Sequence, residues 1–78
     1  MNPPAPQLES LLDEMIEAQR RRVLELASRI SPGIPADDLF QPHDHPALAA
    51  HPEFNFEDGI LAGYLAVRAA LRASRASR

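Results

Sequence analysis

The chain contains no cysteine, no tryptophan and only three glycines among its 78 residues. The absence of cysteine excludes disulfide bonds and thiolate metal sites, and it gives no sign of an oxidising compartment. Three glycines are too few to build a glycine-rich phosphate loop. A chain below about 80 residues buries a small core and usually needs disulfides, a metal ion or partner subunits as well. We therefore expect oligomerisation or a non-thiolate metal site to supply the missing stability.

Long apolar runs are also missing. The longest mostly apolar stretch, Ile60 to Leu71, is too short to span a bilayer and contains Arg68. Residues 1–7 are rich in proline and have uncharged side chains, unlike the basic start of a secretory signal. We therefore expect no membrane association and a cytoplasmic location.

Charged side chains are unevenly distributed. Residues 1–58 hold all eleven carboxylates and four arginines, a net charge of −7, whereas residues 59–78 hold four arginines and no carboxylate. The two parts should therefore attract each other. Arg68, Arg72 and Arg75 share one helical stripe that could bind the phosphates of a nucleic acid. Ion pairing within or between chains is the favoured interpretation, because cations are expected near a helix C-terminus and the whole chain is acidic.

A first helix is predicted over residues 8–30, after a non-helical lead-in over residues 1–7. Its apolar side chains recur every three or four residues on one face: Leu8, Leu11, Leu12, Met15, Ile16, Val23, Leu26 and Ile30. Ser31, Pro32 and Gly33 are expected to end it. Gln19 lies within the apolar stripe, where its amide should either bond to a backbone carbonyl or fix the register of an oligomer.

A second helix is predicted over residues 56–74, with Asn55 as its N-cap and residues 75–78 as a frayed tail. Leu61 and Leu65 lie off its main apolar face, and alanines cover much of the remainder. The main face, expected to pack on the first helix, comprises Phe56, Ile60, Gly63, Tyr64, Val67, Ala70 and Leu71. A helix that is apolar nearly all round is a buried helix, and one partner helix cannot cover it.

The segment between the helices, residues 31–55, is predicted to be a proline-rich linker with short helical turns. Pro46 should open one of these turns, with Asp44 or His45 as its cap, and Pro52 should stop it. Leu39 and Phe40 belong to an earlier turn and should anchor the linker to the core.

The linker also holds all three histidines of the chain. His43, Asp44, His45 and His51 could together bind a metal ion, because imidazole and carboxylate groups suit zinc and iron. Their spacing matches no strong metal-binding motif, so caps for the turn backbones are the favoured interpretation. A metal site and pH-sensing histidines are the alternatives.

Candidate catalytic groups are not evident. Glu57 and Asp58 are adjacent on a predicted helix and diverge by about 100°, so they do not form an acid–base pair. Favourable charge at the start of the second helix explains them better. We therefore expect no enzymatic activity and no cofactor other than a possible metal ion.

These observations predict a single all-α domain over residues 1–78. Its fold is an antiparallel two-helix hairpin with a long proline-rich linker, completed as a four-helix bundle by dimerisation. The predicted interface comprises Gly59, Leu61, Ala62, Gly63, Leu65 and Ala66, with Phe54 and Phe56 at the linker junction. The predicted function is that of a non-enzymatic interaction or assembly module that forms a homodimer and binds a further protein. A metal-binding accessory protein is the alternative, and nucleic-acid binding is a weaker one.

Overall fold

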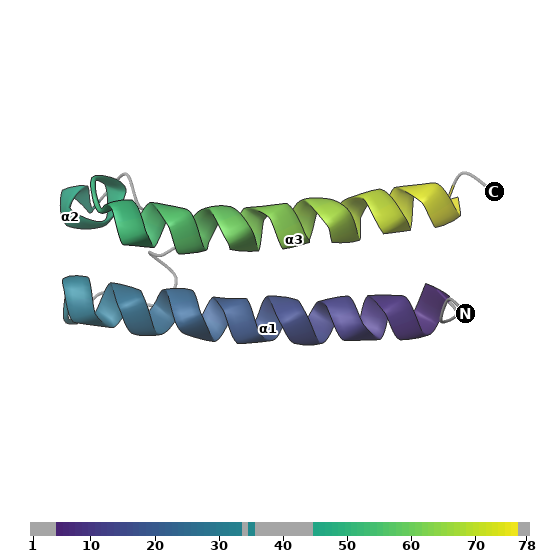
Figure 1. Ribbon diagram of the computed structural model, residues 1–78, viewed down its shortest axis with the longest axis horizontal. Helices are drawn as coiled ribbons and strands as arrows, with labels where there is room; N and C mark the ends of the chain where they lie inside the picture. The colour runs from purple at the N-terminus through teal and green to yellow at the C-terminus, as the bar shows by residue number, and fades with distance from the viewer. Residues whose placement is uncertain (1–4, 34, 36–44, 77–78) are drawn as a thin grey trace.

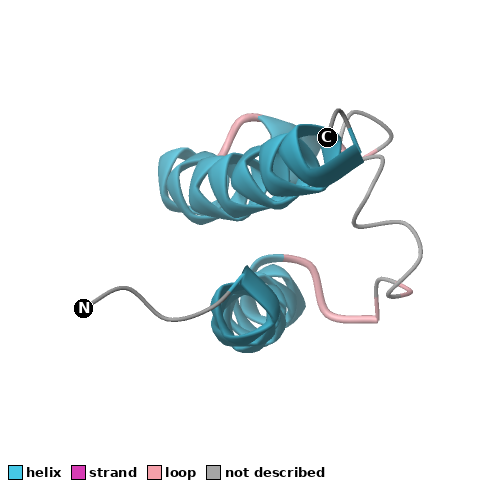
Figure 2. Cartoon of the chain, turned by 90° about the vertical axis from the view of Figure 1, so that its right-hand side faces the viewer, coloured by secondary structure: helices cyan, strands magenta, loops and turns pink. Residues whose placement is uncertain are grey.

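The computed structural model describes residues 5–33, 35 and 45–76. Two long helices, α1 (Ala5–Ile30) and α3 (Pro52–Ala76), run antiparallel, and a short helix, α2 (Pro46–Ala49), lies at the end away from the termini (Figure 1). Seen nearly along their axes, α1 and α3 form one stacked pair (Figure 2). The described residues form helices and turns without any strand. The predicted all-α antiparallel hairpin is therefore confirmed.

Helix α1 begins at Ala5, earlier than predicted, and includes Pro6 in its first turn. Proline is tolerated there because a backbone N–H in the first turn has no helical partner to lose. The helix ends after Ile30, as predicted. The Ser31 N–H donates to the Ala27 carbonyl oxygen over 2.8 Å, and Gly33 has a φ of 88°, a left-handed conformation that favours glycine.

Helix α3 also begins before its predicted start, because Pro52 opens this helix instead of stopping the preceding turn. The cap is His51, whose Nδ1 accepts a hydrogen bond from the Phe54 N–H at 3.3 Å. Asn55, which the sequence predicted as the cap, lies inside the helix. Its Nδ2 donates to the Ala49 carbonyl oxygen at 3.0 Å and so joins α3 to the end of α2.

The short helix α2 forms where the sequence predicted a turn after Pro46. The backbone carbonyl of His45 accepts hydrogen bonds from the N–H groups of Leu48 at 2.9 Å and Ala49 at 3.1 Å. The His45 side chain occupies the cap position without making a capping hydrogen bond. Leu48 is fully buried and fixes α2 on the long helices. Leu39, Phe40, His43 and Asp44 lie outside the described residues.

The core follows the contact between α1 and α3. Its buried apolar residues are Leu12, Ile16, Val23, Leu26 and Ala27 of α1, Leu48 of α2, and Phe54 and Leu61 of α3. Leu12, Ile16, Gln19, Val23 and Leu26 of α1 are spaced alternately four and three residues apart. This spacing keeps one seam of a helix facing its partner, as in coiled coils.

The face of α3 that packs on α1 overlaps the predicted face only in part. Tyr64 and Leu71 of the predicted face pack against the core, as expected. Phe54 and Leu61 are buried in the core. Phe56 and Val67, which were assigned to the core face, are 67% and 51% exposed. Because α3 is apolar on several sides, its hydrophobic periodicity alone does not select the face that packs on α1.

The hairpin is elongated, with extents of 43 × 21 × 20 Å and a radius of gyration of 14.9 Å. A compact domain of this length would have a radius of gyration of about 11.5 Å. The radius of gyration exceeds this value because two helices packed side by side share a single contact surface and enclose little interior volume. None of the described helices combines the length and apolar character needed to cross a membrane.

Two leucines of α1 test where the core lies. Leu26 is 5% exposed and Leu24 is 37% exposed. We expect Leu26→Ala to lower the free energy of unfolding by about 2–5 kcal/mol, because it leaves a cavity in the seam. Leu24→Ala removes the same atoms outside the seam and should cost less than about 1 kcal/mol. Urea denaturation followed by circular dichroism measures both, and equal losses would contradict the assigned seam.

Candidate interaction surface

Exposed apolar side chains line a groove between α1 and α3 on one flank of the hairpin. The groove has a volume of about 190 Å³, and its six lining residues are Leu8, Leu11, Leu12, Met15, Val67 and Leu71. All six are apolar, and four of them (Leu8, Leu11, Met15 and Val67) are among the exposed large hydrophobic residues. Contiguous exposed apolar surface of this kind marks interaction sites in proteins.

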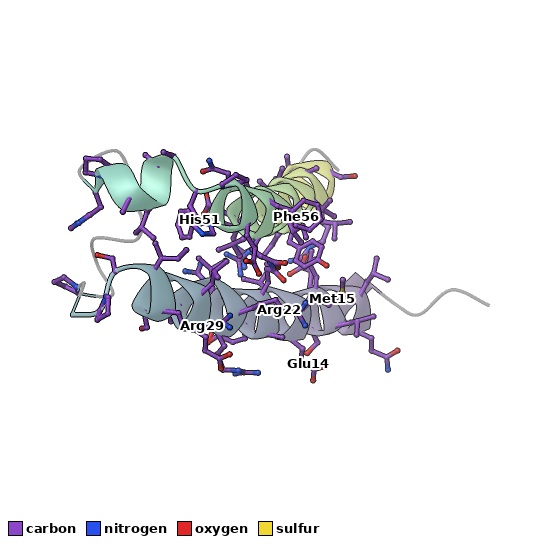
Figure 3. All side chains as sticks on the ribbon, turned by 60° about the vertical axis from the view of Figure 1, so that its left-hand side comes forward. Glu14, Met15, Arg22, Arg29, His51 and Phe56 are labelled. Atoms are coloured by element: carbon purple, nitrogen blue, oxygen red, sulfur yellow. The ribbon has the colours of Figure 1, made fainter. Side chains whose placement is uncertain are left out.

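A second recess of about 220 Å³ continues the groove toward the middle of the hairpin. It is lined by Met15, Ala18, Gln19, Arg22 and Tyr64, and Met15 lines both recesses. Phe56 extends the same flank on α3, because it lies eleven residues before Val67 and three helical turns bring both to one side. Figure 3 labels Phe56 on α3 together with Met15 and Arg22 on α1. We call the groove and Phe56 together the open face.

The side of α3 that points away from α1 carries small residues. Gly59, Ala62, Gly63 and Ala66 are all exposed. A Cβ atom built on Gly59 or Gly63 would meet nothing within 4 Å, so packing inside the chain does not require glycine at either position. Glycine inside a helix costs about 1 kcal/mol relative to alanine. The missing side chains leave room for another backbone to approach α3 closely.

Some of the residues predicted as an interface are buried in the core of the chain, and the others are exposed. Phe54 is fully buried, Leu61 is 6% exposed, and Leu65 packs against the core, so these three residues serve the packing within the chain. The exposed members of the predicted set are Phe56, Gly59, Ala62, Gly63 and Ala66.

The groove itself was missed by the sequence analysis, which assigned its residues to faces buried between the two helices. A signal was present in α1. Leu8, Leu11 and Met15 broaden the apolar stripe beyond the narrow seam that one partner helix covers.

Gln19 forms a buried polar link between the two long helices. It is 6% exposed, and its Nε2 donates to both the backbone carbonyl oxygen and Oε1 of Glu57, each at 2.8 Å. A backbone carbonyl was one of the two alternatives predicted for this amide. The link sets the register of α1 against α3, because sliding either helix by one residue would break both hydrogen bonds and leave a buried amide without a partner.

Two arginines of the C-terminal stripe form ion pairs with α1. Arg68 Nη1 lies 3.0 Å from Asp13 Oδ1, and Arg75 pairs with Glu9. The expected internal pairing is thus present at two positions. Exposed pairs of this kind contribute about 0–1 kcal/mol each, so they guide the packing more than they stabilise it. Arg72 is exposed and forms no ion pair with a described residue. Nucleic-acid binding by Arg68, Arg72 and Arg75 stays a prediction.

The histidine cluster is described only in part. The described residues contain no group of three histidine, aspartate or glutamate side chains placed to hold a metal ion. Nδ1 of His51 accepts the hydrogen bond that caps α3, which leaves Nε2 as the ring atom for other contacts. His43 and Asp44 lie outside the described residues, so metal binding by His43, Asp44, His45 and His51 stays a prediction.

Glu57 and Asp58 lie one turn further into their helix than predicted, because α3 starts at Pro52. The acidic residue of the first turn is Glu53. Glu57 accepts the hydrogen bonds from Gln19, whereas Asp58 is half-buried. Burial disfavours the charged carboxylate and raises the pKa of Asp58 above its ordinary value.

Comparison with known proteins gives no match to a protein-family model, to a curated protein or to a solved structure.

The raised pKa of Asp58 predicts a pH-dependent effect of Asp58→Asn. Above the folded-state pKa, the native state carries a charge that burial disfavours, so the wild-type chain is destabilised there. The penalty disappears as the pH falls below the unfolded-state pKa, where both states are protonated. We expect Asp58→Asn to raise the melting temperature at pH 7 and the gain to shrink toward pH 3. Thermal melts across this range measure the difference, and a gain that grows on acidification would contradict the assignment.

Proposed function

We propose that this chain is a non-enzymatic interaction and assembly module that works as a homodimer. Two hairpins pair through their open faces and complete a four-helix bundle. The groove between α1 and α3 carries this proposal, because four of its six apolar lining residues, Leu8, Leu11, Met15 and Val67, are left exposed in the single chain. A second hairpin supplies the helices that a two-helix core lacks.

Association through the open face is energetically reasonable. Leu8, Leu11, Met15, Phe56 and Val67 are between 38% and 67% exposed. Burying such a side chain fully contributes about 1.5–3 kcal/mol, so covering the exposed half contributes about 1 kcal/mol. A two-fold dimer covers each residue twice. The resulting sum, on the order of 10 kcal/mol, is comparable to the association cost of about 4–15 kcal/mol.

Two matched substitutions on α1 test this proposal. Met15 lines the groove, whereas Leu24 lies on the opposite flank of the helix, and the two are 39% and 37% exposed. We expect Met15→Asp to convert the dimer into a monomer, because it places a charge in an apolar interface. Leu24→Asp introduces the same charge outside the interface and should leave the dimer intact. Sedimentation equilibrium measures the mass of each variant.

Circular dichroism serves as the control for folding, since both variants should keep the helical content of the wild-type chain. A dimeric Met15→Asp variant would show that the open face is not the interface. A monomeric wild-type chain at micromolar concentration would overturn the proposal as a whole.

A further inference from the structure

We infer that the second copy packs antiparallel on the open face, with Phe56 of each chain seated in the groove of its partner. This inference rests on the proposed self-association and specifies its geometry. The two α3 helices cross near Gly63, where the two-fold axis passes between them.

Phe56 and the groove are complementary in shape and chemistry. Phe56 is 67% exposed, the largest exposed fraction among the large hydrophobic residues that the structure describes, and it projects from α3. The groove offers about 190 Å³ bounded by leucine, methionine and valine side chains. An apolar cavity of about 150 Å³ is sufficient to hold a benzene molecule. The volume of the groove is therefore sufficient for a phenyl ring, and the apolar lining favours such a ring over a polar group.

The positions of Phe56 and the groove on α3 suit a two-fold axis. Phe56 lies near the α2 end and Val67 lines the groove near the termini, about 16 Å apart along the helix at 1.5 Å per residue. Rotation about an axis midway between them brings each Phe56 opposite the partner's groove. In such an isologous contact the same surface of both chains is used, so the Phe56 ring of each chain enters the groove of the other.

The midpoint between Phe56 and Val67 falls where α3 is smoothest. Gly63 lies near this level, seven residues after Phe56 and four before Val67, so the three residues share one side of α3. It is exposed, and a Cβ atom built on it would meet nothing within 4 Å. Two helices cross closely where their side chains are smallest. The close crossing explains why glycine is present at a helical position that the packing within the chain does not require.

The helix dipoles favour the antiparallel orientation. The charged groups of α3 are largely used within the chain, because Arg68 and Arg75 pair with Asp13 and Glu9, and Glu57 accepts hydrogen bonds from Gln19. An antiparallel partner opposes the dipoles of the two α3 helices, which is favourable, whereas a parallel partner aligns them.

A single spin label reports the orientation of the dimer, since the chain has no cysteine of its own. Ser74→Cys places the label near the end of α3, outside the crossing. In the antiparallel dimer the two labels should be roughly 35 Å apart along the helix axis, because each lies about twelve residues from the two-fold axis. In a parallel dimer they should lie within about 15 Å. Double electron–electron resonance distinguishes these distances.

The docking of Phe56 is tested separately by the dimer dissociation constant. We expect Phe56→Ala to raise this constant by about tenfold or more, the effect typical of a buried aromatic anchor. Leu24→Ala, which truncates an exposed apolar residue on the other flank, should change it less than about threefold. Isothermal dilution calorimetry measures both variants.

The outcomes separate this inference from the proposed function. A dimer with the short label distance, or one that Phe56→Ala leaves unchanged, overturns the antiparallel docking while self-association stands. A chain without dipolar coupling and with the mass of a monomer overturns both. The long distance together with the Phe56 effect supports the inference.

Discussion

The seam between α1 and α3 is the contact on which the rest of the structure depends. A stripe of residues spaced alternately four and three apart along α1, all apolar except Gln19, is buried against α3, and Leu48 of α2 closes one end. Within this seam the hydrogen bonds from Gln19 to Glu57 set the register of the helices. Apolar contacts alone would tolerate sliding by a turn, whereas a buried amide that loses its partners costs about 1–3 kcal/mol. That register brings Arg68 to Asp13 and Arg75 to Glu9, and it brings Val67 beside Met15 to form the groove.

A hairpin with one seam leaves most of each helix outside the core. In α1 the outside is largely charged, as expected for a surface helix. In α3 the outside combines Phe56 and Val67 with exposed glycines and alanines, a composition better suited to contact with another helix than with water. The proposed dimer explains these features together: the groove receives an aromatic ring, the small residues allow close approach, and the opposed helix dipoles favour the antiparallel orientation. Each feature has a role in the dimer that the isolated chain does not give it.

The sequence was sufficient to predict the two long helices, their antiparallel packing, the end of α1 at Ile30 and a carbonyl partner for Gln19. The start of α3 was predicted wrongly because Pro52 was interpreted as the end of the preceding turn. Proline is also common in the first turn of a helix. The face of α3 was predicted only in part, with Tyr64 and Leu71 but without Phe54 and Leu61, because both of its candidate faces are apolar. Phe54, Leu61, Arg68 and Arg75 recur every seven residues, so the face that pairs the arginines with Asp13 and Glu9 also buries Phe54 and Leu61. The charge pattern and the hydrophobic pattern of α3, taken together, would have identified this face.

The groove depends on how α1 and α3 are rotated about their own axes relative to each other, and the sequence of neither helix alone specifies that rotation.

The central claim is that the open face is covered by a second copy of the same chain. Native mass spectrometry of the untagged wild-type chain at low micromolar concentration tests it most directly. The account predicts a species of twice the chain mass, without added ligand or metal. A species of the single-chain mass would contradict the account, because Phe56 and the groove would then remain in water.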